Sequence, residues 1–195
     1  MSNVSELRSD IFEGQSQTYT VKATYGFKEQ PFNNDAKVEN VKYALVFRVT
    51  NGHMDGAAYS LSGNFDGTPV QTEFSLDPMS HALTATVEVE NFNQKEFTVT
   101  ISCSGVAEDV TLSSIVPEGT ISAEQALKCL MEKQSSLLSS LYDQNKNFNA
   151  ELHLRVIVKQ GKSYWYVGIA TGSERLKALL IDGTNGEVLA IRDVL

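Results

Sequence analysis

The spacing of hydrophobic residues changes once along this chain of 195 residues. Before Pro117, apolar and polar side chains alternate in short runs, at 19–27, 41–49, 59–65, 83–89 and 97–103. A period of two is typical of β-strands that bury one face. Beyond Pro117, apolar residues first recur at steps of three and four, which predicts an amphipathic helix. This change of period indicates two separately folded domains.

Turn residues separate the strand-like runs of the first part. Asp66-Gly67 lies between two such runs, and this dipeptide favours a type I′ hairpin turn because both central residues need a positive φ. About seven strands, spaced by roughly 8 to 12 residues, predict an all-β immunoglobulin-like sandwich over residues 17–116. A β-barrel has the same strand spacing and stays open as the alternative. Residues 1–16 are polar and unpatterned, so we expect a flexible N-terminal segment there.

The part after Pro117 predicts one helix and then four strands, over residues 117–195. Ser122 and Gln125 have the spacing of a capping box, in which each side chain satisfies a backbone N–H of the first helical turn. Gln134 lies within the apolar stripe of the helix, so either its amide has a buried partner or the helix bends at 134–136. The stripe consists of Ala123, Ala126, Leu127, Leu130, Met131, Leu137, Leu138 and Leu141. The four strands that follow predict an antiparallel meander with one face on the helix.

The end of the chain resembles a known family. A strand that ends in WYVGI is followed by LLIDGTNGEVLAI, in which Asp182, Gly183, Gly186 and Glu187 form the turn before an apolar last strand. Together with the preceding helix, this order is similar to that of PepSY domains, and the likeness covers residues 121–193. The resemblance implies an α+β domain of one helix on a four-stranded antiparallel sheet. It also implies an extracytoplasmic protein of the bacterial envelope that binds a peptide or protein, such as a peptidase.

Charge and cysteine content exclude several classes of function. The formal net charge of −8 repels phosphate backbones, so we expect no nucleic-acid partner. The two cysteines, Cys103 and Cys129, form no metal or redox motif and do not imply a disulfide. The chain has no run of 18 apolar residues and does not begin with a signal-like segment, so we expect no membrane insertion. A trimmed leader would leave the same N-terminus, and a protein with such a leader would be anchored to the envelope.

Catalytic chemistry has little support. His53 and Asp55 form a conceivable acid/base or metal pair, but a solvated turn explains them, and His81 also falls in a loop. We find no nucleophile with a partnering base and no nucleotide-binding or metal-binding motif. We therefore expect a protein that is not an enzyme and has no cofactor, metal or catalytic residue.

One binding site is predicted on the last sheet. If Trp165 packs on the helix, then Tyr164 and Tyr166 point to the opposite face together with His153 and Arg155. Tyrosine and arginine clusters are typical of binding hot spots. The alternative is that this face packs against the sandwich. We expect a binding module with Tyr164, Tyr166, His153 and Arg155 as its contact residues, and the competing hypothesis is a passive structural or assembly protein with no ligand.

Overall fold

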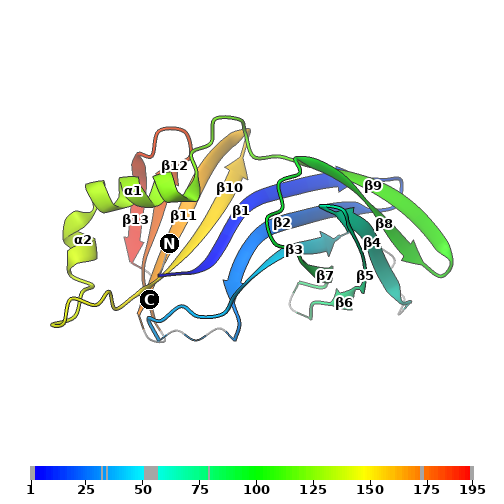
Figure 1. The fold of residues 1–195 in the computed structure, drawn as a ribbon. Helices are drawn as coiled ribbons and strands as arrows, with labels where there is room; N and C mark the ends of the chain where they lie inside the picture. Colours follow the sequence, from blue (N-terminus) through cyan, green and yellow to red (C-terminus); the bar gives the residue numbers. More distant parts are fainter. Residues whose placement is uncertain are drawn as a thin grey trace. The chain divides into compact units, whose positions relative to one another are not determined.

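Strands dominate the computed structural model, which describes residues 3–31, 33, 35–50, 57–78, 80–171 and 174–193 (Figure 1). The first nine strands are β1 (Val4–Gln15), β2 (Thr20–Glu29), β3 (Val41–Val49), β4 (Tyr59–Phe65), β5 (Thr68–Glu73), β6 (Ser75–Leu76), β7 (Leu83–Glu88), β8 (Glu96–Cys103) and β9 (Val106–Ser114). Helices α1 (Ala123–Lys133) and α2 (Ser135–Ser139) and strands β10 (Glu151–Lys159), β11 (Lys162–Thr171), β12 (Glu174–Asp182) and β13 (Val188–Asp193) follow. Neither α1 nor α2 has the length and hydrophobicity of a transmembrane span, and they are the helices of the described residues.

The predicted fold class, an immunoglobulin-like sandwich followed by a separate PepSY-like α+β domain, is wrong. The chain forms one mostly-β domain, in which β1 to β9 make a nearly closed antiparallel barrel and β10 to β13 make a four-stranded extension. From β1, hydrogen bonding runs through β2, β3 and β7 to β6 on one side, and through β9, β8 and β4 to β5 on the other. Sandwiches and barrels share their strand spacing and differ in which strands pair, so the periodicity did not separate them.

β1 occupies most of the segment that we expected to be flexible. Its end pairs with β9, where Phe12 lies opposite Ser114, and its start runs parallel to β10, where Leu7 lies opposite Leu154. β1 is thus part of both the barrel and the extension. Polar residues at buried positions hide its alternation in the sequence; these residues are Ser5, Glu6 and Asp10.

The chain divides into two compact units that are not contiguous in sequence. Unit 1 consists of Met1–Ser9, Gly26–Lys42 and Val116–Leu195, and unit 2 consists of Asp10–Tyr25 and Tyr43–Ile115. Strands β1, β2 and β3 each contribute residues to both units. The units therefore do not coincide with the predicted ranges 17–116 and 117–195.

The core of unit 2 combines aliphatic side chains with a cluster of aromatic rings. Phe97 lies at its centre, with ring centroids 5.1 Å from Phe12, 5.1 Å from Phe92 and 5.8 Å from Phe65. All three pairs are edge-to-face, an arrangement that the ring quadrupole favours. The alternating residues predicted at 41–49 and 97–103 supply Phe47 and other buried members of this core.

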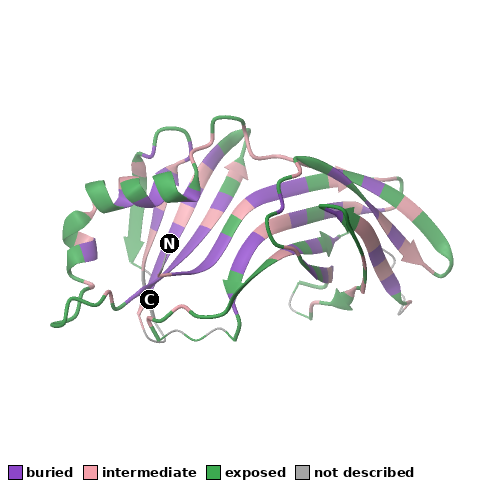
Figure 2. Ribbon diagram, viewed as in Figure 1, coloured by how far each residue is buried: buried purple, intermediate pink, exposed green. Residues whose placement is uncertain are grey.

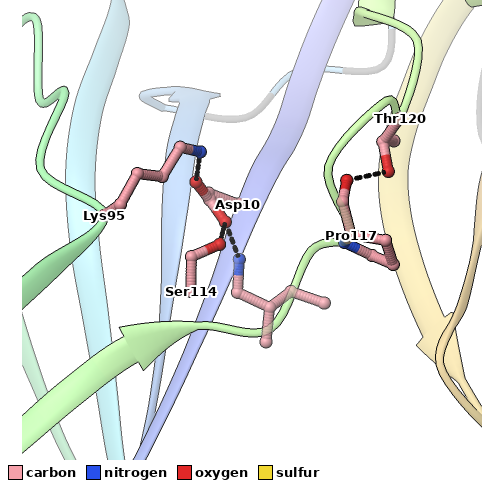
Figure 3. Close-up of polar contacts among 6 residues, drawn as sticks. Asp10, Lys95, Ser114, Pro117 and Thr120 are labelled. Carbon is pink, nitrogen blue, oxygen red and sulfur yellow. Dashed lines mark hydrogen bonds and ion pairs between the residues drawn. The ribbon is translucent and has the colours of Figure 1, made fainter.

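A buried carboxylate in unit 2 has its partners in place (Figure 3). Asp10 Oδ2 accepts from Lys95 Nζ at 2.7 Å, and Oδ1 accepts from Ser114 Oγ at 2.6 Å and from the Ile11 backbone N–H at 2.9 Å. Figure 3 also shows Thr120, whose hydroxyl donates to the Pro117 carbonyl oxygen at 2.7 Å in the turn before α1. Asp10 shows how a polar residue is accommodated inside this unit, since a buried charge is tolerated when it is paired.

In unit 1, α1 lies against one face of the sheet formed by β10 to β13 (Figure 1). The predicted capping box is confirmed, because Ser122 Oγ accepts from the Gln125 N–H and Gln125 Oε1 accepts from the Ser122 N–H. Trp165 Nε1 donates to the Ile121 carbonyl oxygen at 2.9 Å and joins β11 to the segment before α1. The helix ends at Lys133 and α2 begins after Gln134, so the bend is the alternative that the structure shows.

The turn between β12 and β13 has the local structure that its residues predicted. Asp182 Oδ1 accepts from the backbone N–H groups of Thr184 at 2.8 Å and Asn185 at 3.2 Å, and Gly186 has a φ of +70°. A Cβ at Gly186 would lie 2.4 Å from Cys129 Sγ, so a side chain at this position would collide with α1. Glycine is needed there both for the backbone conformation and for the close approach of the helix.

Candidate functional site

The register of β10 and β11 brings the four predicted contact residues to one face of the sheet. Arg155 pairs with Tyr166, Ile157 with Tyr164, and His153 with Gly168. Directly paired residues project to the same side, and alternate residues along a strand do so too. We call this side the tyrosine face and the opposite side, on which α1 lies, the helix face.

Buried and less buried residues alternate along many of the strands (Figure 2). The four predicted contact residues differ in how accessible they are. Tyr164 and Tyr166 are half-buried, and the Arg155 side chain is 32% exposed. His153 is only 6% exposed, so it does not offer its ring to a partner. The accessible predicted residues are therefore the two tyrosines and the arginine, and Ile157 adds an exposed apolar side chain to the same face.

Sequence reasoning missed two members of this face, Glu6 and Arg8, because both lie in β1. The parallel pairing of β1 and β10 places Glu6 opposite His153 and Arg8 opposite Arg155. Glu6 Oε1 accepts from Arg8 Nε at 2.7 Å, and Glu6 Oε2 accepts from Arg155 Nη2 at 2.8 Å. One buried carboxylate thus holds two guanidinium groups side by side. The available signal in the sequence was the spacing of Glu6 and Arg8, because residues two positions apart in a strand project to the same face.

The two neighbouring arginines stabilise the ionised form of Glu6. Burial by itself would raise the pKa of this carboxyl, but the hydrogen bond from Arg155 and the positive charges of Arg8 and Arg155 outweigh burial, and the pKa lies below its usual value. Glu6 is therefore an anion at neutral pH. The Arg155 Nε, in contrast, is buried and has no hydrogen-bond partner among the described residues.

A second polar cluster in unit 1 anchors the connection between β2 and β3. Glu151 Oε1 accepts from the backbone N–H groups of Asp35 and Ala36, both at 3.0 Å, and Glu29 Oε1 accepts from that of Glu39 at 2.7 Å. Within the described residues, the Oε2 atoms of both glutamates are buried without a hydrogen-bond partner. Burial, with a further contribution from the charge of Glu29, raises the pKa of Glu151 against the opposing effect of Ser5 and the two backbone groups.

The other sequence candidates lie either outside the described residues or apart from one another. His53 and Asp55 lie outside the described residues, and His81 is in the turn between β6 and β7, where its N–H donates to the Asp77 carbonyl oxygen. Cys103 and Cys129 are both free thiols. In the part of the chain that the structure describes, no group of three or more histidine, cysteine, aspartate or glutamate residues could hold a metal ion.

The described residues of the tyrosine face supply hydrogen-bond donors and apolar area. The guanidinium groups of Arg8 and Arg155 are donors, the two tyrosines provide apolar area with a polar tip, and the Glu6 carboxylate is occupied by both arginines. Comparison with known proteins gives no family that would assign a role to these residues. No protein-family model, curated protein or solved structure matches the chain, and the resemblance to PepSY domains stays a prediction.

Proposed function

We propose that this protein is a non-catalytic binding module that takes an acidic peptide segment of a partner protein on the tyrosine face. The observation that carries the proposal is the Glu6 carboxylate, which holds Arg8 and Arg155 together on that face. Arg155 in turn pairs across the strands with Tyr166. Arginine and tyrosine are enriched among the residues that dominate binding energy.

The two arginines keep donors for a ligand. A guanidinium group has five N–H donors, and Glu6 accepts from one nitrogen of each arginine. Because Glu6 fixes both side chains, fewer rotamers are lost when a ligand binds, and the binding free energy is larger for the same contacts. A carboxylate is the peptide group whose geometry matches a guanidinium fork.

The balance of charge on this face favours an acidic partner. Arg192 of β13 belongs to it, since His153, Gly168, Ala178 and Arg192 follow one another across the paired strands. Three arginines and the paired Lys159 and Lys162 thus share the face with three carboxylates, the buried Glu6 and Glu151 and that of Asp182. The Asp182 carboxylate accepts from turn amides. The rest of the chain is acidic, with a net charge of −8. A long polyanion such as a nucleic acid would meet that negative charge, whereas a short acidic peptide would contact only the arginines.

A labelled peptide of six glutamates tests the proposal by fluorescence anisotropy, with a peptide of six lysines and a short single-stranded DNA as comparison probes. We expect saturable binding of the glutamate peptide that weakens as salt is added, because salt screens exposed charges. The variant Arg155→Ala should bind about ten-fold more weakly, the value of one charge-assisted hydrogen bond. The matched control is Arg48→Ala, at an exposed position of β3 in unit 2.

Circular dichroism establishes that each variant is folded, and Tyr166→Ala provides a second variant on the same face. Binding of the glutamate peptide that survives both Arg155→Ala and Tyr166→Ala would contradict the proposal. Failure of the glutamate peptide to bind the unmodified protein would favour a passive structural role. Tighter binding of the DNA would replace the acidic peptide with a nucleic acid and would also contradict the proposal.

A further inference from the structure

A cavity of about 360 Å³ opens on the helix face of unit 1, away from the tyrosine face. Its walls come from α1, α2, the start of β1 and the start of β10. Leu152 belongs to the helix face because it alternates with His153 along β10 and pairs with Ile169. The cavity is therefore separate from the residues on which the proposed function depends.

The cavity has an apolar interior and an apolar rim. Leu130 is fully buried and Leu127, Leu138 and Leu152 are nearly so, while Met131 and Tyr142 at the opening are 57% and 52% exposed. Tyr142 is held in position by Phe148, with an edge-to-face ring contact at 5.3 Å and a β-bridge. Small-molecule sites have volumes of roughly 300 to 1,000 Å³ and mostly apolar walls, so this cavity has the size and lining of a small ligand site.

The cavity lies beside the bend at Gln134, and residues of both α1 and α2 line it. The sequence predicted one continuous stripe of apolar residues from Ala123 to Leu141, which a straight helix would press onto the sheet. Met131, in the last turns of α1, is exposed instead of packed, and Leu138 reaches the cavity from α2, beyond the bend. The apolar side chains on both sides of the bend thus surround a space that no described side chain fills.

One charged group lines the cavity. Glu124 is the only carboxylate among the described lining residues, which include no lysine, arginine or histidine. It lies in the first turn of α1, is exposed to solvent, and has no ion pair among those that the described residues form. A carboxylate beside an apolar cavity complements a ligand that has an apolar body and a positive charge.

We propose that this cavity binds a small amphipathic cation, an aliphatic amine or ammonium compound whose chain lies among Leu127, Leu130 and Leu138 and whose charged group lies beside Glu124. Burial of the chain provides the affinity, because it removes apolar surface from water. The ion pair with Glu124 decides the sign of charge that the cavity accepts. The exposed Met131 at the rim is suited to ligand binding, because its flexible side chain can pack against ligands of different shape.

Isothermal titration calorimetry with octylamine, octan-1-ol and octanoate tests the proposal, because these probes share a chain and differ in the charge of the head group. We expect one-to-one binding in the order octylamine, octanol, octanoate, with a difference of about ten-fold or more between the two charged probes at low salt. Glu124→Gln should make octylamine and octanol bind equally. Glu124→Lys should place octanoate above octylamine. The matched control is Glu132→Gln, an exposed glutamate of α1 that does not line the cavity.

Several outcomes would overturn the inference. These are no saturable binding of any probe, equal binding of octylamine and octanoate, or the same effect from Glu132→Gln as from Glu124→Gln. Octanol that binds better than octylamine would show a neutral apolar pocket and would also contradict it. Arg155→Ala should leave octylamine binding unchanged, so that failure of the acidic-peptide proposal and failure of this one are distinguishable.

Discussion

The two compact units of this protein differ in how many polar residues they bury. Unit 2 has a core of aliphatic side chains around edge-to-face phenylalanine rings. Of the buried polar or charged residues that the structure describes, only Asp10 belongs to this unit. Unit 1 contains the others, which are Ser5, Glu6, Glu29, Glu151, His153 and Ser163. It also contains the cavity beside α1.

The buried carboxylates of the two units differ in how completely they are hydrogen-bonded. Both oxygens of Asp10 accept hydrogen bonds, so this residue contributes to the stability of unit 2. Glu29 and Glu151 each leave one buried oxygen without a partner among the described residues, which costs stability. Departures from a fully satisfied core are expected to gather at functional sites. Both of our binding proposals accordingly concern unit 1.

The largest expected effect breaks the aromatic core of unit 2. Phe97→Ala should lower the free energy of unfolding by about 3 to 5 kcal/mol, because it removes a buried ring and leaves a cavity. Urea denaturation monitored by the fluorescence of Trp165, the single tryptophan, measures the unfolding of unit 1. We expect the Trp165 transition to move together with the circular dichroism transition, since β1 and β2 belong to both units.

The control for this variant is Val106→Ala, at a position of β9 that is 64% exposed and should cost less than about 0.5 kcal/mol. A Trp165 transition that stayed in place while the circular dichroism transition moved would show that the units unfold independently. The protein would then be one mostly-β domain in its architecture but would not unfold as one cooperative unit.

The next effect concerns the carboxylate beneath the two arginines. Glu6→Gln should cost about 1 to 2 kcal/mol at pH 7, because it replaces two charge-assisted hydrogen bonds that are partly exposed to solvent. Since the pKa of Glu6 is lowered in the folded protein, its contribution is present above the ordinary glutamate pKa and is lost as the pH falls through the lowered value. Urea denaturation at pH 7 and in acid measures both points.

Glu13→Gln is the matched control, because Glu13 lies on the same strand and forms an ion pair with Lys22 in which both side chains are 48% exposed. Such a pair contributes about 0 to 1 kcal/mol. If Glu6→Gln had no larger effect than Glu13→Gln, the carboxylate would not hold the arginines, and the proposed function would lose its main support.

The smallest expected effect is a relative gain in stability, whereas the two substitutions above lower the stability. The pKa of Glu151 is raised in the folded protein, so this carboxyl favours the fold in its neutral form, and its contribution is lost as the pH rises through the raised value. Glu151→Gln keeps an oxygen for the N–H groups of Asp35 and Ala36 and cannot ionise. Its stability relative to the unmodified protein should therefore increase as the pH rises from 5 to 8, as measured by thermal denaturation. A parallel pH dependence of the two proteins would contradict the raised pKa.

Local features were predictable because their signals are local. Asp66 and Gly67 have φ values of +51° and +85° between β4 and β5, as the hairpin dipeptide predicted, and Ser122 starts α1 with its capping box. The shared face of His153, Arg155, Tyr164 and Tyr166 followed from the alternation of β10 and β11. The partners of Arg155 did not follow, because they come from a strand more than a hundred residues away in the sequence.

By itself, the sequence determined where most strands and the helix lie and which residues alternate to opposite faces, since period and turn chemistry act over a few residues. Only the tertiary structure decided that β1 joins barrel and extension, that Glu6 holds two arginines, and that a bend after Lys133 opens a cavity. Strand pairing and the burial of charge depend on contacts between distant segments. A pattern read along the chain carries little information about those contacts.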